Sequence, residues 1–313
     1  MDGTTSRSVR RCLGVCGAFA LAVGFAAAGT ARGEAPTLRW KFTPGETLHY
    51  QMEQKSVTEV KAGGQQGIKT TVTQILDTTW TVQSVDPSGT AEWTQSIDRL
   101  RSKIDSSFGT MDFDSKSEKA PEGPIASGVV PVYKALVGAK FRYKMSPRGE
   151  LSDIQVSEGL VKSLKEAGPT AANSGMLSEE GLREMIRESS LVLPDQPLDK
   201  PWTRQKKIPM PPIGTQVVDI TYKYDGAENG VDKIATETKV TLEPDPKSNI
   251  DAKIGSQQGT GGFSFDGKAG RVVGSKTAQK IEMVVNVMNS QVTQSNDTTT
   301  EMKLVKAEEG AAK

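Results

Sequence analysis

Cysteine and histidine are scarce in this 313-residue chain. The two cysteines, Cys12 and Cys16, both lie among the first 33 residues, and His49 is the sole histidine. A disulfide framework, a zinc cluster or a cysteine nucleophile would need thiols in the rest of the chain. A multi-histidine metal site and the Ser-His-Asp or Cys-His arrangements would need further histidines. The composition therefore excludes the commonest metal and nucleophilic sites.

The single histidine does not indicate a hydrolase. Its neighbours on the same strand face would be Gln51 and Glu53, a polar row, so we expect His49 to be exposed. Neither a Gly-x-Ser-x-Gly elbow nor a Ser-x-x-Lys pair is present. We therefore predict no catalytic, cofactor-binding or metal-ligating residue, no cofactor, and a protein that is not an enzyme.

Neither sign of charge is in excess. The chain carries 39 Lys and Arg against 38 Asp and Glu, and beyond the first 33 residues the counts are 35 and 37. A near-neutral surface gives no electrostatic basis for binding nucleic acid or an anionic membrane. We therefore expect no nucleic-acid partner.

Long hydrophobic runs are absent except near the N-terminus. An arginine cluster within residues 7–11 precedes an uncharged, Ala-rich run over residues 12–28, which is short for a membrane span and typical of a signal peptide. We place cleavage near Gly33, with Ala31 as the alternative, and an uncleaved anchor is the competing interpretation. Residues 1–33 thus predict export to the periplasm, the extracellular space or the cell surface, with no stable membrane span after cleavage.

The remaining chain alternates between apolar and polar residues with a period of two. Residues 38–42 and 48–53 predict a hairpin with one apolar face, and the even-numbered apolar residues within 68–82 predict a long strand. The apolar positions of the next strand change from odd to even between Ile97 and Leu100. We therefore expect a β-bulge near Asp98.

Helical signals are confined to the middle of the chain. Residues 109–128 read as a surface loop, and residues 129–137 as either a short strand or a helical turn. Ser157 is a suitable N-cap for a short helix that stops at Gly168. Ser178 is a suitable N-cap for a second helix, whose buried face would include Leu182, Met185 and Ile186.

Prolines interrupt the alternation once. Six of the sixteen prolines fall within residues 194–212, so we expect a linker without regular structure there. It would separate an N-terminal β half with the helical insert, residues 34–193, from a C-terminal β half, residues 213–306. Residues 307–313 are predicted to form a disordered tail.

The two halves share a similar order of aromatic and glycine residues. Trp40 and Trp202 each precede a Tyr-bearing strand, and an aromatic pair precedes a glycine turn in each half. A duplication would explain this similarity, and so would chance recurrence in a β protein. We predict a mainly β fold of antiparallel meander sheets, half-barrel or sandwich-like, with a short two-helix insert.

Two segments resemble ligand-binding motifs but depart at a ligand position. Residues 262–269 follow the phosphate-loop pattern until Ala269, which replaces the hydroxyl that binds magnesium. The alternating Phe263 and Phe265 predict instead a strand that ends in a hairpin turn at residues 266–267. Residues 112–114 begin like a calcium loop, but Lys116 occupies the next ligand position.

Two further candidates are weaker. A site with a pair of acids for glycoside hydrolysis is also compatible with the sequence, because a sequence does not show the distance between two carboxylates in the fold. Trp40, Trp80 and Trp93 occupy apolar-face positions, which favours a role in the core over sugar stacking.

Two stretches of the chain are similar to a family of exported bacterial proteins of unknown function, the domain of unknown function 6263 type. The first is Leu38-Arg39-Trp40-Lys41-Phe42-x-x-Gly45-Glu46-x-x-x-Tyr50, and the second is Phe141-x-Tyr143-x-x-x-x-x-Gly149-Glu150-Leu151 before a helical stretch. The resemblance implies no activity and carries over no catalytic residue.

These observations favour a non-catalytic binding or scaffold protein that acts through a sheet face or an interior cavity. A carrier of the periplasmic lipid or lipoprotein type is one alternative, by analogy of fold, and it would need an apolar pocket larger than its own side chains fill. A carboxylate-dependent hydrolase and a cell-surface structural module are the others. The expected partner is an apolar small molecule or another envelope protein.

Overall fold

The computed structural model describes residues 35–63, 67–166, 178–187, 189–210, 213–248, 250–287 and 290–306. The predicted signal peptide, the predicted helix end at Gly168 and the predicted tail lie outside these residues. Among the helices of the described part, none is long and apolar enough to cross a membrane.

The described strands form one large antiparallel sheet of twelve strands. The order is β6-β5-β3-β2-β1-β12-β11-β10-β9-β8-β7, and β4 pairs with β3 off this path. In chain order the strands are β1 (Thr47–Ala62), β2 (Ile68–Val85), β3 (Ala91–Ser106), β4 (Gly109–Asp114), β5 (Lys140–Met145), β6 (Leu151–Val156), β7 (Trp202–Met210), β8 (Gly214–Glu228), β9 (Val231–Pro244), β10 (Asp251–Asp266), β11 (Arg271–Val287) and β12 (Ser290–Val305).

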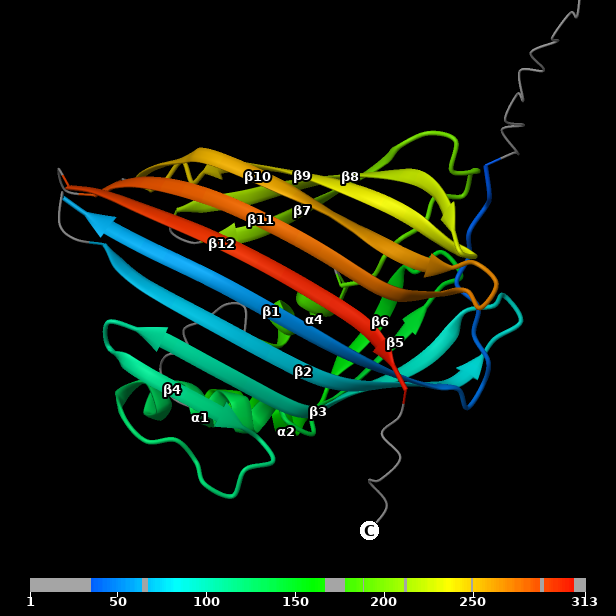
Figure 1. The fold of residues 1–313 in the computed structure, drawn as a ribbon, viewed down its shortest axis with the longest axis horizontal. Coiled ribbons are helices and arrows are strands. Elements are labelled where there is room, and N and C mark those ends of the chain that lie inside the picture. Colours follow the sequence, from blue (N-terminus) through cyan, green and yellow to red (C-terminus); the bar gives the residue numbers. More distant parts are fainter. Residues whose placement is uncertain are drawn as a thin grey trace, which may run out of the picture. The chain divides into compact units, whose positions relative to one another are not determined.

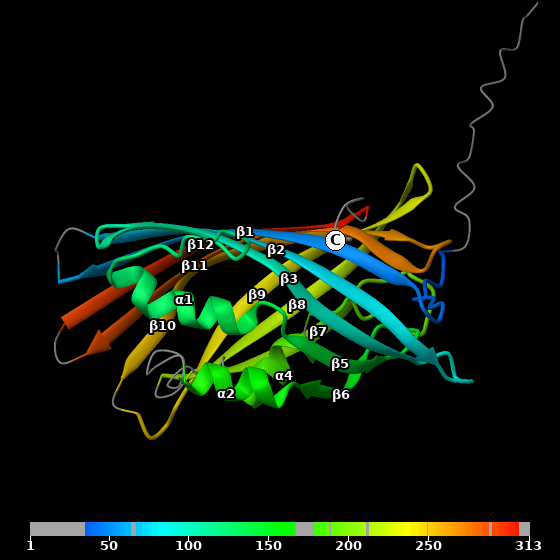
Figure 2. The same ribbon diagram turned by 90° about the horizontal axis from the view of Figure 1, so that it is seen from below.

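The sheet is a single curved layer that does not close (Figures 1 and 2). The helices lie on its concave side, toward which the strands β5 and β6 at one edge of the sheet curl (Figure 2). We call this side, which carries Tyr50, Trp80 and Phe265, the inner face, and the opposite side the outer face. The prediction of a mainly β protein made of antiparallel meanders is confirmed, in the form of one curved sheet.

Each half of the chain forms one half of the sheet. The first half starts at the centre with β1 and proceeds outward to β6, whereas the second starts at the edge with β7 and proceeds inward to β12. The two halves meet where β1 pairs with β12, from His49 opposite Val305 to Ala62 opposite Val292. Trp40 precedes the central strand and Trp202 begins an edge strand, so the two tryptophans are not equivalent positions of a repeat.

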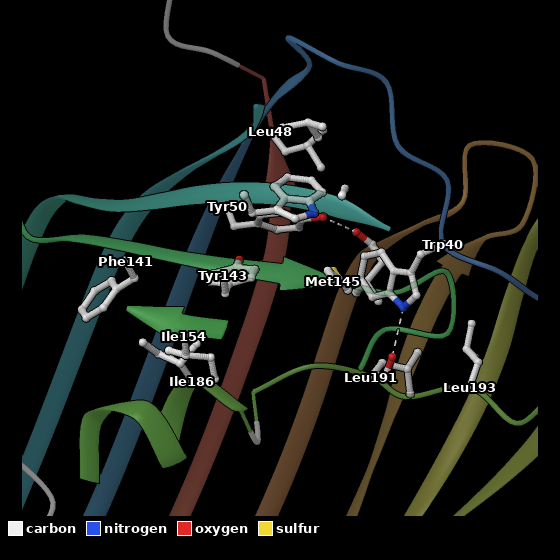
Figure 3. Close-up of a cluster of buried hydrophobic side chains, with 14 of the residues drawn as sticks. Trp40, Leu48, Tyr50, Phe141, Tyr143, Met145, Ile154, Ile186, Leu191 and Leu193 are labelled. Carbon is white, nitrogen blue, oxygen red and sulfur yellow. Dashed lines mark hydrogen bonds between the residues drawn. The ribbon is translucent and has the colours of Figure 1, made fainter. Parts of the chain in front are cut away.

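The larger hydrophobic core lies on the inner face beneath a segment of residues 189–201, which we call the strap (Figure 3). The Trp40 indole donates a hydrogen bond from Nε1 to the Leu191 carbonyl at 3.0 Å, and its ring meets Phe265 edge-on at 5.5 Å. The Trp202 indole likewise donates to the Val192 carbonyl at 3.1 Å. The strap is thus held by side chains from both halves of the chain.

The predicted hairpin between residues 38–42 and 48–53 is wrong in its first arm. Leu38 and Trp40 are buried as predicted, but residues 35–43 do not join the sheet. The Trp40 amide donates to the Pro147 carbonyl at 2.8 Å and the Lys41 amide donates to the Gly270 carbonyl at 3.0 Å. The apolar side chains of this arm pack against the core as expected, while its backbone bonds to two turns.

A smaller core lies between the sheet and helix α1 (Pro124–Leu136), where a surface loop was predicted for residues 109–128. That range holds strand β4 and the first turns of α1. Tyr133 of α1 packs against Phe113 at 5.4 Å and shares a hydrogen bond with the buried Ser102 hydroxyl at 3.0 Å. The helix also decides the open question about residues 129–137.

The two predicted helices are present as α2 (Glu158–Glu166) and α4 (Glu179–Arg187). Both predicted caps are made, because Ser157 accepts from the Leu160 amide at 3.3 Å and Ser178 from the Gly181 amide at 3.0 Å. Met185, however, is 49 % exposed rather than buried.

The predicted linker of residues 194–212 contains the edge strand β7. The strand has Pro209 near its end, which an edge strand tolerates because one side of its backbone has no ladder partner. The β-bulge predicted near Asp98 is confirmed, since Ile97 pairs with Thr78 while Arg99 pairs with Asp77.

Candidate binding groove

The core beneath the strap has no room for a ligand. The cavity there measures about 20 Å³ and is lined by packed side chains such as Tyr50, Trp80 and Met302. A cavity of this size holds about one water molecule. A ligand of this protein therefore has to bind outside the covered core.

The inner face is hollowed instead where β9 and β10 separate. These strands pair only from Asp232 opposite Phe265 to Glu237 opposite Thr260. Beyond that point β9 continues to Pro244 and pairs with β8, while β10 begins at Asp251 and pairs with β11. The sheet therefore splits toward the connection between the two strands.

Local features of β10 account for the split. The ladder with β11 shifts its register around Gly255, which is a β-bulge, and bulges bend and twist a strand. Below the split, Gly259 approaches Thr238 so closely that a Cβ atom would lie 2.7 Å from the Thr238 Cβ. At the split, the Gln257 side chain replaces a ladder bond, because its Oε1 accepts from the Val240 amide at 3.1 Å.

The hollow, which we call the groove, has a volume of about 360 Å³. Every side chain that lines it is half-buried, so each is partly accessible to a ligand. The lining residues are Gln54, Met210, Gln216, Leu242, Ile254, Gln279, Ile281, Met283, Gln294, Asn296 and Thr298.

The lining is polar on one side and mainly apolar on the other. The polar wall belongs to β1 and β12 and consists of Gln54, Gln294, Asn296 and Thr298. The floor, on β11, β10 and β9, consists of Ile281, Met283, Ile254 and Leu242, with Gln279 at its end, and Gln216 and Met210 form the far rim. A molecule in the groove would meet hydrogen-bonding groups on one side and aliphatic groups on the other.

Hydrogen bonds orient the polar wall. The Thr298 hydroxyl donates to Asn296 Oδ1 at 2.6 Å, and the Ser56 hydroxyl donates to the same oxygen at 3.2 Å. The two hydroxyls are themselves 3.0 Å apart. Because both donors engage the amide oxygen of Asn296, its amide nitrogen is directed elsewhere and can serve a ligand as donor.

A second, larger hollow of about 610 Å³ lies on strands β3, β5 and β6. It brings two acids together, Glu92 and Asp153, as a carboxylate-dependent hydrolase would require. Lys144 lies between them, because it pairs with Glu92 across the strands and bonds to Asp153 at 2.8 Å. Both acids raise the pKa of Lys144, chiefly through the hydrogen bond with Asp153. Both acids are thus held by neighbouring side chains, Asp153 by the Lys144 ammonium at 2.8 Å and Glu92 by the Ser84 hydroxyl at 3.1 Å.

His49 is half-buried on the outer face rather than fully exposed. Its Nδ1 lies 2.9 Å from the Thr79 hydroxyl, which donates to Asp98 Oδ2 at 2.5 Å. The hydroxyl proton is used by Asp98, so Nδ1 carries a proton and donates to Thr79. His49 is thus a member of a surface hydrogen-bond chain and lies on the face opposite the groove.

The calcium-like segment of residues 112–114 also has a structural role. Asp114 binds the Arg99 guanidinium through two hydrogen bonds, of 3.0 Å and 2.5 Å. These bonds are the main reason that the pKa of Asp114 is lowered to about 2. Among the described residues, no cluster of three or more His, Cys, Asp or Glu side chains could hold a metal ion.

The phosphate-loop-like segment is the predicted hairpin. β10 ends at Asp266, residues 267–270 form the turn, and β11 starts at Arg271. The Ala269 amide donates to the Asp266 carboxylate at 2.8 Å, which closes the turn. The predicted core positions of the tryptophans are also found, with Trp40 and Trp93 buried and Trp80 half-buried among aromatic rings.

The groove was not predicted from the sequence. One signal was present, because Gln54 and Gln279 occupy inward positions in strands whose other inward residues are mostly apolar. The strand pairing that gathers these residues around a split in the sheet has no signal in the sequence.

An open, curved antiparallel sheet with a groove on its inner face defines a mainly β protein. The model of the Family of unknown function (DUF6263) matches residues 88–270. The chain belongs to this family. No curated protein matches the chain.

Solved structures offer only distant likenesses. A chain from a structure titled "Lipid-protein interactions in lipovitellin" is 12 % identical, with a TM-score of 0.46. The match covers 87 % of this chain and 26 % of that one, so this chain spans about a quarter of the length of its counterpart. DynF from the dynemicin pathway of Micromonospora chersina is 8 % identical, with a TM-score of 0.21 and 87 % of each chain covered.

Proposed function

We propose that this protein is an exported, non-catalytic binding protein whose groove holds a small amphiphilic molecule. The observation that carries the proposal is the divided lining of the groove, with amides and a hydroxyl on one wall and aliphatic side chains on the floor. The volume of about 360 Å³ suits a small molecule, since ligand pockets measure roughly 300 to 1,000 Å³. Export rests on the arginine cluster and the uncharged run of the first 33 residues.

The floor of the groove favours an apolar group. Ile281, Met283, Ile254 and Leu242 are half-buried, so part of their apolar surface faces solvent. Covering such surface stabilises a complex by roughly 25 cal/mol for each Å² of apolar area. Methionine adapts its shape to a partner, so Met283 and Met210 would accommodate chains of differing form.

The polar wall favours a head group that forms hydrogen bonds. Primary amides offer both donors and acceptors, and four of the lining residues are glutamines. Such a wall can satisfy hydroxyl, ester or amide groups of a ligand.

The other candidate functions receive less support. An enclosed carrier would need an apolar cavity, whereas the covered core leaves about 20 Å³. A hydrolase would need two acids free to face a substrate, whereas Asp153 bonds to the Lys144 ammonium and Glu92 accepts a hydrogen bond from the Ser84 hydroxyl. Binding in the groove requires neither an enclosed cavity nor a pair of acids.

Binding of the uncharged probe N-phenyl-1-naphthylamine tests this proposal. Its fluorescence should rise and saturate at one probe per protein. Leu242→Trp should lower the affinity at least tenfold, because the indole would fill part of the groove. Thr241→Trp is the matched control, since Thr241 is the exposed neighbour of Leu242 on the same strand. An absence of binding, or equal binding by both variants, would refute the proposal.

A further inference from the structure

None of the eleven side chains that line the groove carries a charge. Charged residues make up 25 % of the whole chain, so a lining of this size would ordinarily include two or three. The lack of charged side chains is particular to this region of the inner face, because charged pairs are present on the outer face of the same strands. Examples are the Lys280–Asp297 pair at 2.9 Å and the nearby pair of Lys276 with Glu301.

Two cations that point inward from β7 have partners of their own. Arg204 and Lys206 occupy inward positions of β7, opposite Ile220 and Val218. The Arg204 guanidinium donates to the Ser190 carbonyl of the strap at 3.4 Å, and Lys206 also has a partner. Neither residue lines the groove.

A charged head group would therefore lose hydration in the groove without gaining an opposite charge. Burying an ion without a partner is far more costly than burying a polar group that keeps its hydrogen bonds. An uncharged hydroxyl, ester or amide would bond to the wall, for example to the Asn296 amide nitrogen. The lining thus discriminates by charge even though it has no charge of its own.

The volume limits the size of the apolar part. The groove of about 360 Å³ lies at the lower end of the range of ligand pockets, which measure roughly 300 to 1,000 Å³. It therefore suits one small amphiphile with a single chain.

We propose that the groove selects single-chain amphiphiles with an uncharged head group, such as monoacylglycerols, over fatty acids and cationic amphiphiles of the same chain length. This inference rests on the proposed function, because it specifies the ligand class of the same groove. The chain would lie on the floor between Ile281 and Leu242, and the head would face the polar wall.

Three ligands that share a twelve-carbon chain but differ in the charge of the head group test the inference. Glycerol monolaurate, laurate and dodecyltrimethylammonium would each be titrated into the protein below the micelle-forming concentration, by isothermal titration calorimetry. Glycerol monolaurate should bind at least tenfold more tightly than either ion. Equal or tighter binding of laurate or of the cation would overturn the inference while leaving the proposed function intact. Binding of none of the three would refute the proposed function itself.

A charge placed in the groove should reverse the selectivity. Ile281→Lys puts an ammonium on the floor, so it should lower the affinity for glycerol monolaurate and raise that for laurate at least tenfold. Ala278→Lys is the matched control, because Ala278 lies on the outer face of the same strand and is exposed. It should leave both affinities unchanged. A gain in laurate affinity in both variants would overturn the inference, because the net charge of the sheet, and not a charge inside the groove, would then explain the gain.

Discussion

Gly149 provides a stringent test of how the strap is held. Its φ is +92°, and a Cβ atom there would lie 2.6 Å from Trp40 Nε1 and closer still to the Leu191 carbonyl oxygen. A methyl group would therefore push apart the two atoms that form the buried hydrogen bond between Trp40 and the strap. Gly149→Ala should destabilise the protein through both backbone strain and the loss of this contact.

Gly138 allows the two effects to be separated. Its φ is +78°, but nothing lies within 4 Å of a Cβ atom built there. Gly138→Ala should therefore show the strain alone, about 1–2 kcal/mol for an L-residue at positive φ. Gly149→Ala should add about 1–3 kcal/mol for an unsatisfied buried group and a similar amount for overpacking. The difference between the two variants should be about 3 kcal/mol.

Urea unfolding followed by tryptophan fluorescence measures this difference. The urea concentration at the midpoint of unfolding should fall much further for Gly149→Ala than for Gly138→Ala. The slope of the unfolding free energy against urea concentration should be the same for both variants. A difference below about 1 kcal/mol would refute the reasoning, because crowding at the strap would then contribute little.

Other contacts lead to further predictions. Tyr50→Phe should lower the free energy of unfolding, measured in urea, by about 1–3 kcal/mol, because the buried hydroxyl donates to the Val272 carbonyl at 2.8 Å. Tyr143→Phe should lower it less, since the hydrogen bond of its hydroxyl is 3.3 Å long. Equal losses in the two variants would contradict this reasoning. The pKa of Asp114 is lowered from 3.8 to about 2, so its stabilising contribution is complete above pH 4 and is lost as the pH falls toward 2. Carboxyl NMR should show that low midpoint, and Arg99→Gln should move it back toward 3.8; a wild-type midpoint near 3.8 would exclude the stated role of Arg99.

The strands were predictable because burial of one face imposes a period of two. Tyr50, Val82 and Trp93 are buried where the alternation places them. The bulge at Asp98 was visible as a change of phase in the same pattern. These features depend on local sequence alone.

Helix α1 was not predictable from local signals. Pro124 suits the first helical position, but the helix also contains Gly128 and Pro131, which lower helix propensity or interrupt a helix. Its stability comes from packing, since Ala126, Val130 and Tyr133 are buried against the sheet. Tertiary contacts of this kind override propensity and are not visible in the sequence.

The groove was beyond the reach of sequence reasoning for a different reason. Its residues come from seven strands that extend from Gln54 to Thr298 in the chain. They meet only because β1 pairs with β12 and because β9 separates from β10 beyond Glu237. Alternation predicts which residues point inward, but not which strands adjoin.

The family match ends where β11 begins. It covers residues 88–270 and therefore includes Leu242 and Ile254 but none of the polar wall. The matched region thus contains only part of the floor, since Ile281 and Met283 lie beyond it.

Methyl NMR of ¹³C-methyl-methionine protein tests the central claim most directly, because methionines lie both in the groove and far from it. Met283 and Met210 line the groove, whereas Met111 and Met145 are buried in the two cores. Titration with glycerol monolaurate should shift the methyl signals of Met283 and Met210 with saturation and leave those of Met111 and Met145 unchanged. Shifts confined to the core methionines, or no shift at all, would contradict binding in the groove.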